Sequence, residues 1–141
     1  MIPKFRAWYV LAEEMIDVRV IDWNNMIVDS FSPYIEIPLE KVILMQSTGL
    51  KDKNGKEIFE GDVLEIQDIK MIVRFGSYNY IETSKSGNHT LGIMCDGLGF
   101  YVECLNVAAP DKISPFEPET LKESVVIGNI YESQELLEVK E

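Results

Sequence analysis

The chain has 141 residues, 46% hydrophobic and 26% charged, which is typical of one globular domain with its own core. Thirteen basic residues against 24 acidic ones give a net charge of −11. This charge repels phosphates over about 8 Å at physiological salt, and no local basic patch offsets it, so we expect no direct nucleic-acid binding. Apolar runs fall far short of the ~20 residues of a membrane span, and no signal peptide is recognisable, so we expect a cytoplasmic protein without membrane contact.

The first forty residues are predicted to form short strands. Residues 4–9 alternate in character, and Ile16 and Val18 alternate with charged neighbours at the period of two typical of a half-buried strand. A turn follows, so residues 15–29 are expected to form a β-hairpin. Pro38 can then begin one helical turn, because proline is tolerated at the first helical position.

Residues 45–63 hold the strongest turn signal in the chain. Asn54-Gly55 suits a two-residue type I′ turn, in which both central residues have positive φ. A hairpin centred there pairs Leu50 with Phe59 across the two strands. This stretch opens onto the most regular run of predicted strands.

The middle of the chain is predicted to build a small barrel or roll. Short antiparallel strands at residues 63–66, 71–75 and 78–82 are separated by reversals at 67–68 and 76–77. This spacing is typical of a compact, mainly β fold.

A polar loop at residues 84–90 leads to a second hairpin over residues 91–105, with its turn at Asp96-Gly97. In that hairpin Cys95 and Cys104 lie too far apart for a disulfide, which needs Cα atoms within about 7 Å. We therefore expect two reduced thiols.

The last third contains a long loop and one more strand. Residues 106–124 hold three prolines and several charges and are predicted to be a loop, and residues 125–127 a final strand. Ser133 is a suitable N-cap for a short C-terminal helix.

Three segments together resemble a known family. Residues 44–62 read LMQSTGLKDKNGKEIFEGD, and the flanking pieces are KFRAW at 4–8 and VIGNIYE at 126–132. In this order they resemble the YopX family of phage and prophage proteins. The resemblance implies a phage or prophage origin and a mainly β fold with an SH3-like barrel. It implies no activity and no catalytic residues, because the function of that family is undefined.

The residue patterns and the family resemblance together predict a single domain. Its parts are an N-terminal hairpin extension over residues 1–41, an SH3-like β barrel over residues 42–131, and a short C-terminal helix over residues 132–141.

No motif for catalysis or cofactor binding is assembled. The glycines before Lys56 are misspaced for a phosphate loop, and Glu57 stands where a hydroxyl must reach magnesium. The turn that begins at Asp52 misplaces the glycine and the last acid of a calcium loop. His89 is the only histidine, so a zinc site would need unusual ligands. We predict no catalytic, cofactor-binding or metal-binding residue, and a protein that is not an enzyme.

The best candidate contact surface is aromatic. Phe75, Tyr78 and Tyr80 cluster around one predicted turn, and aromatics on an SH3-like barrel can form a peptide-binding groove. The same rings could instead fill a small core. The leading hypothesis is a non-enzymatic accessory protein that binds another protein, with a host-encoded partner as one case. Uncovered strand edges also favour self-association.

Two alternatives remain open. The first is an acidic decoy that occupies a host nucleic-acid-binding protein by mimicking phosphate charge. The second is a small enzyme with a carboxylate-based site, for which Glu82 and Glu103 are the residues to inspect.

Overall fold

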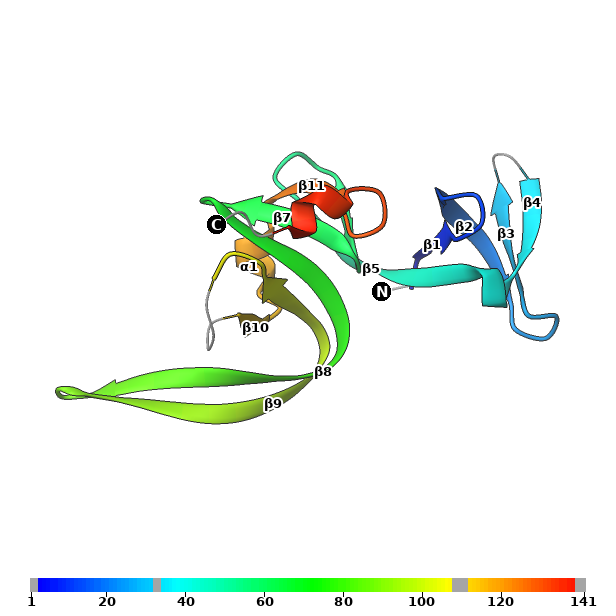
Figure 1. The fold of residues 1–141 in the computed structure, drawn as a ribbon. Helices are drawn as coiled ribbons and strands as arrows, with labels where there is room; N and C mark the ends of the chain where they lie inside the picture. The colour runs from blue at the N-terminus through cyan, green and yellow to red at the C-terminus, as the bar shows by residue number, and fades with distance from the viewer. Residues whose placement is uncertain (1–2, 32–33, 108–111, 139–141) are drawn as a thin grey trace.

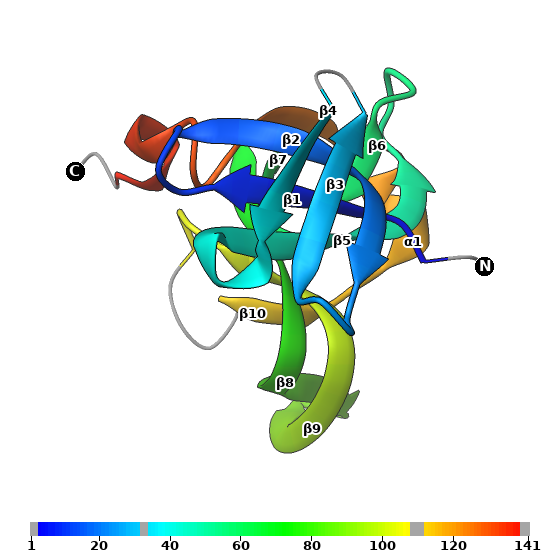
Figure 2. The ribbon, with the colours of Figure 1, turned by 90° about the vertical axis from the view of Figure 1, so that its right-hand side faces the viewer.

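In a computed structural model, the chain forms two antiparallel sheets, and β5 carries it from the first half of the molecule to the second (Figures 1 and 2). The structure describes residues 3–31, 34–107 and 112–138. The elements are β1 (Phe5–Tyr9), β2 (Glu14–Asp22), β3 (Ile27–Phe31), β4 (Tyr34–Pro38), η1 (Leu39–Lys41), β5 (Val42–Lys51), β6 (Glu57–Phe59), β7 (Asp62–Ile66), β8 (Ile69–Ser86), β9 (His89–Cys104), β10 (Ile113–Pro115), α1 (Pro118–Leu121), β11 (Val125–Asn129) and η2 (Gln134–Leu137).

The first sheet has the strand order β4-β3-β2-β1-β5-β6. Strand β1 lies between β2 and β5, so Ala7 pairs with Ile16 on one side and with Leu44 on the other. Alternate side chains turn inward, and Ala7, Ile16, Val28 and Ile37 form a buried cluster. The predicted hairpin over residues 15–29 and the helical turn after Pro38 are both confirmed.

The second sheet has the order β10-β9-β8-β7-β11 and its own buried cluster. Leu64, Val73 and Val102 contribute from β7, β8 and β9, while Leu121 of α1 and Ile58 of β6 close the cluster from outside this sheet. The mainly β prediction is confirmed, but the two sheets stay open rather than closing into a barrel. The predicted C-terminal helix is not confirmed, because the part of residues 132–141 that the structure describes contains only the short 3-10 helix η2.

The turn at residues 52–55 differs from its prediction. Gly55 has φ +84° but Asn54 does not have positive φ, and the Gly55 N–H donates to the Asp52 carbonyl at 3.0 Å. This pattern fits a type I turn followed by a left-handed glycine rather than a type I′ turn. Phe59 pairs with Ser47, not with Leu50, because the register shifts between Ser47 and Lys51.

A turn with two positive-φ residues is found instead at Gln67-Asp68, where the φ angles are 48° and 67°. It joins β7 to β8 and pairs Ile66 with Ile69. The reversal predicted at residues 67–68 is therefore confirmed.

The largest correction concerns β8 and β9. The reversals predicted at residues 76–77 and at Asp96-Gly97 do not occur. The two strands pair without interruption from Met71 with Cys104 to Ser86 with His89. Their turn lies at residues 87–88, inside the stretch predicted to be a loop. The dipeptides Gly76-Ser77 and Asp96-Gly97, which resemble turns in the sequence, lie inside one continuous ladder of paired strands.

The predicted loop over residues 106–124 is partly regular structure. Strand β10 pairs with β9, and α1 follows with Leu121 buried, while residues 108–111 lie outside the described part. The final strand is confirmed as β11, which pairs with β7. No helix within the described ranges is long and apolar enough to cross a membrane.

Candidate protein-contact surface

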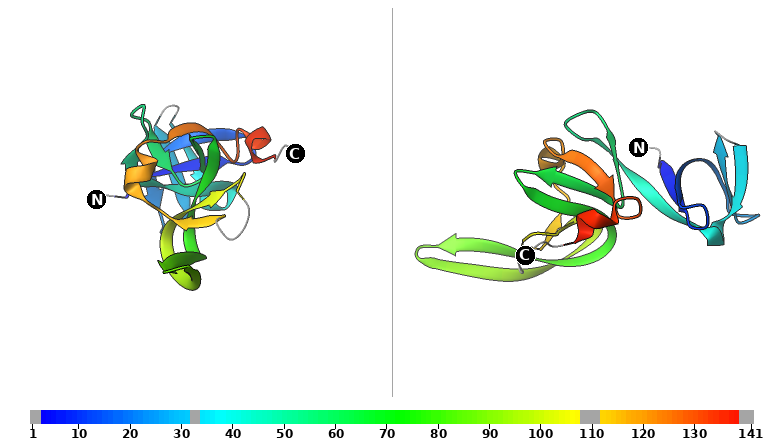
Figure 3. Two further views of the ribbon diagram at one scale, coloured as in Figure 1. Left: turned by 90° about the vertical axis from the view of Figure 1, so that its left-hand side faces the viewer. Right: turned by 45° about the horizontal axis from the view of Figure 1, so that its top comes forward.

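The β8–β9 hairpin continues beyond the body of the molecule as a projecting arm, which we define as residues 76–99 (Figure 3). Strand β7 pairs with β8 only up to Ile72, and β10 pairs with β9 only from Tyr101. Within the described residues, both outer edges of the arm are therefore without a neighbouring strand. A two-stranded ribbon alone is marginally stable in water, so such an arm gains most from being covered.

Two glycines mark where the arm leaves the body. Gly76 has φ +148° and Gly99 has φ +130°, and the two face each other in the ladder. A Cβ at either position would meet nothing within 4 Å, so the backbone conformation, and not lack of space, requires glycine there. The hairpin curves strongly between the body and the arm (Figure 1). We attribute this bend to the glycine pair.

One face of the β8–β9 hairpin carries an apolar stripe, which we define as Phe75, just before the arm, and Ile81, Met94 and Leu98 within it. Directly paired residues of an antiparallel ladder share a face, and alternate pairs return to it. The stripe thus continues the face on which Val73 and Val102 are buried in the core. Outside the body this face is uncovered: Leu98 is 83% exposed and Met94 66%. The apolar face that is buried in the body therefore continues along the arm, where its side chains are exposed to solvent.

The opposite face carries a row of tyrosines, which we call the tyrosine face. Tyr78 stacks on Tyr101 with ring centroids 4.6 Å apart and lies 5.7 Å from Tyr80. The Tyr78 ring covers Gly97, where a Cβ would clash with it. Leu91 and Ile93 extend this face toward the tip and are 62% and 51% exposed.

The three aromatics predicted to form a contact surface are thus divided between the two faces. Tyr78 and Tyr80 lie together on the tyrosine face, whereas Phe75 packs edge-to-face with Phe100 on the other side, with ring centroids 4.9 Å apart. Sequence reasoning missed Leu98 and Met94, because it placed a turn at Asp96-Gly97. They could have been found by continuing the strand alternation of side chains between the two faces through the predicted turns at residues 76–77 and at Asp96-Gly97.

A second feature lies where the two halves of the molecule meet. Arg6 of β1 is ion-paired with Asp62 of β7, with 2.7 Å between Nη2 and Oδ1, and it also donates to the Glu60 carbonyl at 3.2 Å. Its guanidinium lies over the Phe59 ring, 4.8 Å from the centroid. Burial raises the pKa of Asp62, while the Arg6 charge acts in the opposite direction. This buried pair ties the first strand to the second sheet.

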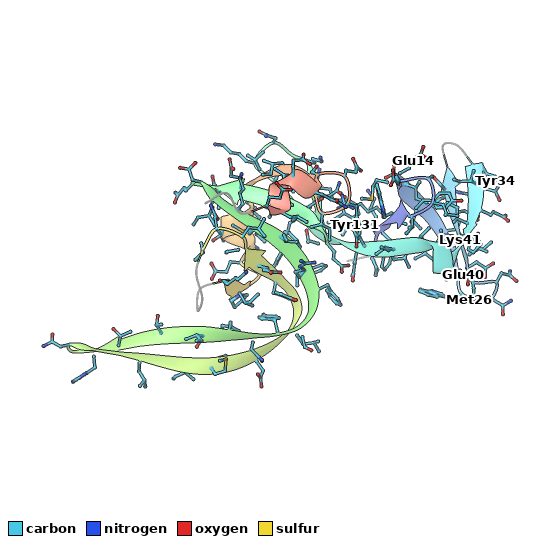
Figure 4. The ribbon with its side chains drawn as sticks, in the orientation of Figure 1. Glu14, Met26, Tyr34, Glu40, Lys41 and Tyr131 are labelled. Carbon is cyan, nitrogen blue, oxygen red and sulfur yellow. The ribbon has the colours of Figure 1, made fainter. Side chains whose placement is uncertain are left out.

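Beside this pair, Trp8 stacks on Tyr131 with centroids 5.6 Å apart, and Tyr131 lies at the junction of the two halves (Figure 4). Burial, and then the Glu60 charge, raise the pKa of the Tyr131 hydroxyl. Burial likewise raises the pKa of Glu60. The two rings border a groove of about 590 Å³, whose other lining residues are Val10, Glu13, Glu132, Gln134 and Glu135. The groove combines aromatic and acidic side chains.

The other candidates from the sequence are not brought together. Glu103 is ion-paired with Arg74 at 3.2 Å, whereas Glu82 is exposed on the arm and accepts a hydrogen bond from Tyr80 at 3.4 Å. His89 is exposed at the tip, and neither Cys95 nor Cys104 is in a disulfide. Among the residues that the structure describes, no group of three or more His, Cys, Asp or Glu side chains could hold a metal ion.

Comparisons with known proteins find similarity over almost the whole chain. A family model described as YopX protein matches residues 4–138. The crystal structure of protein EF1440 from Enterococcus faecalis is similar to this chain, with 29% sequence identity and a TM-score of 0.54. That match covers 98% of this chain and 99% of the other. No curated protein matches.

Proposed function

The chain belongs to the YopX family, and from that premise we propose that it is a non-enzymatic accessory protein that works by binding another protein. We also propose that it derives from a phage or prophage and acts in the cytoplasm of a bacterial host, where its partner is encoded by the host. Neither the family match nor the similar crystal structure names a substrate or a partner.

The observation that carries the proposal is the tyrosine face of the arm. Tyrosine is enriched among the residues that dominate binding energies, because its large rigid ring buries much area at little entropic cost. Tyr78 stacks on Tyr101 and its ring lies beside that of Tyr80, and Leu91 and Ile93 continue the surface. An arm that is open on this face and on both edges can receive a partner without rearrangement of the body.

The arrangement of polar groups supports a binding role over catalysis. Glu103 is paired with Arg74, and Glu82 lies on the projecting arm, so the two carboxylates that the sequence singled out do not share a site. His89 stands at the exposed tip without a hydrogen-bonded nucleophile among the described contacts.

The proposal is tested by capturing proteins from a nuclease-treated bacterial lysate on the immobilised chain, over a series of salt concentrations. We expect a stoichiometric partner that survives moderate salt, and we expect Tyr78→Ser/Tyr80→Ser to reduce its capture at least about tenfold. The matched control Met94→Ser/Leu98→Ser changes the opposite face and retains the partner. Failure to capture any protein, or equal loss in both variants, would contradict the assignment to this face.

A second candidate function rests on the acidic groove beside Trp8 and Tyr131. Its three glutamates and the net charge of −11 favour a basic partner, as expected of a decoy for a nucleic-acid-binding protein. This candidate predicts a basic partner that is released as salt rises and is lost from Glu132→Gln/Glu135→Gln. The same partner would be retained by the variant without Tyr78 and Tyr80.

A further inference from the structure

We propose that the groove beside Trp8 and Tyr131 binds an arginine side chain from a basic segment of another protein. The guanidinium would stack on the aromatic pair and be held by the glutamates of the same groove. This inference rests on the second candidate function and deepens it, because it names the group that enters the groove and the contact that selects it. It does not involve the arm.

The groove is formed by β1 together with two segments that are far apart in the sequence. One is the turn between β1 and β2, with Glu13, and the other follows β11, with Glu132 and Glu135. The second segment is held in place by Asn129, whose Oδ1 accepts hydrogen bonds from the N–H groups of Tyr131 and Glu132 at 3.0 and 2.8 Å. This wall is therefore positioned before a ligand arrives, which lowers the entropic cost of binding.

The size of the groove fits a side chain with its adjoining backbone. Its volume of about 590 Å³ lies within the range of about 300–1,000 Å³ that is typical of sites for organic ligands. A bare metal ion would leave most of this space empty. A segment of a protein that carries a long side chain would fill more of it.

The charge of the groove favours a cation. Glu13, Glu132 and Glu135 are exposed, and none of them forms an ion pair with a described residue. The described lining residues include no lysine or arginine. A cation that enters therefore gains these carboxylates without displacing an existing partner. Unpaired glutamates are common on a chain of net charge −11, and what distinguishes these three is the aromatic pair in the same groove.

The geometry of the aromatic pair favours arginine over lysine. Trp8 and Tyr131 stack with an interplanar angle of 19° and centroids 5.6 Å apart, so each ring covers one face of the other. A cation then meets a single flat ring face and not a cage of several rings. A planar guanidinium can lie on one such face and direct its N–H groups at carboxylates beside it, whereas the ammonium of lysine gains most from being surrounded. The fold already contains the same kind of contact, with the Arg6 guanidinium 4.8 Å from the centroid of the Phe59 ring.

The test compares two peptides of equal length and charge, hexa-arginine and hexa-lysine, titrated into the full chain at low salt and followed by calorimetry. We expect hexa-arginine to bind about fivefold or more tightly than hexa-lysine. In the variant Trp23→Phe, Trp8 is the single tryptophan, so its fluorescence reports on the groove. Trp23 is exposed, and it lies in the same turn as Met26, which is far from Tyr131 (Figure 4). Hexa-arginine should change this fluorescence more than hexa-lysine does.

Matched variants separate the aromatic contact from the charge. Trp8→Leu should reduce the ratio of the two affinities to less than about twofold while hexa-lysine still binds. Glu132→Gln/Glu135→Gln should weaken both peptides about tenfold. The control Glu119→Gln/Glu123→Gln removes the same charge outside the groove and should weaken them less than about threefold. Circular dichroism shows whether each variant is folded, and the fluorescence of Trp8 tests the stacking even without a folded Trp8→Leu.

Equal affinity for the two peptides would overturn the inference, as would Trp8 fluorescence that hexa-arginine leaves unchanged. If Glu132→Gln/Glu135→Gln nevertheless weakens both peptides selectively, the second candidate function stands and only the arginine contact is refuted. Equal weakening by the two double glutamine variants would refute the groove as a site altogether. The tyrosine face is tested separately, by capture from a lysate.

Discussion

Replacement of Asp62 by asparagine tests the buried pair that joins the two halves of the molecule. The Asp62 side chain is 1% exposed, and both of its oxygens accept hydrogen bonds: Oδ1 from Arg6 at 2.7 Å and Oδ2 from the Phe59 N–H at 2.8 Å. Asparagine has almost the same shape but only one acceptor oxygen. In either orientation its NH₂ group must therefore face one of these two donors.

The expected magnitude follows from these contacts. Loss of a hydrogen bond to a charged group costs about 1.5–3 kcal/mol, and a donor left buried without an acceptor costs about 1–3 kcal/mol. Arg6 would also remain buried without its counter-ion, as in other broken buried pairs, which lose about 3–5 kcal/mol. We therefore expect Asp62→Asn to lower the free energy of unfolding by about 3–5 kcal/mol, a large part of the 5–15 kcal/mol of a typical domain.

The assay is urea unfolding at pH 7, followed by circular dichroism, with Arg6→Met and the double variant completing a double-mutant cycle. We expect a coupling energy of at least about 1 kcal/mol between Arg6 and Asp62. The matched control is Glu119→Gln, which breaks the exposed pair with Lys122 and should leave the urea midpoint unchanged. A coupling energy near zero, or a cost for Asp62→Asn below about 1 kcal/mol, would refute the reasoning.

Two further predictions concern Asp52 and Gly97 of the arm. Asp52→Ala removes the acceptor of three backbone N–H groups, including that of Val126 on β11, so urea unfolding at pH 7 should show a loss of about 2–4 kcal/mol. Burial raises the Asp52 pKa, but these donors outweigh it and hold the pKa below its usual value. Its stabilisation is therefore present above the unfolded pKa of about 3.9 and lost as pH falls through the lower folded pKa, so the wild-type urea midpoint should fall more steeply below about pH 4 than that of Asp52→Asn. Gly97→Ala should displace the Tyr78 ring and increase hydrogen exchange along the arm, whereas Gly55→Ala, which strains a turn at φ +84° outside the arm without meeting any side chain, should leave exchange in the arm unchanged.

The sequence predicts the parts of the fold that local patterns encode. The alternation of Ile16 and Val18 with charged residues is enough to predict β2, because one face of a half-buried strand must be apolar. Pro38 likewise predicts the helical turn η1. The three segments that resemble the YopX family are not needed for these conclusions, since each conclusion depends only on neighbouring residues.

The arm shows where local reasoning fails. Gly76 and Gly99 carry the same local signal as turn glycines, and only their pairing across the ladder shows that they bend a continuous hairpin. Once two turns are inserted, every side chain beyond them is assigned to a wrong neighbour. Phe75, Tyr78 and Tyr80 lie close together in the sequence, but only the pairing of β8 with β9 shows that Phe75 occupies the face opposite to the two tyrosines.

By itself, the sequence determined the family, the mainly β class, the acidic surface and the hydrophobic alternation of the strands. Only the tertiary structure decided which residues far apart in the chain meet: Arg6 with Asp62, Trp8 with Tyr131, and Leu98 with the face that continues the core. The physical reason is that strand periodicity is a local property of the backbone. Strand pairing and ion pairing depend instead on how the chain closes its long loops, which no short window of sequence encodes.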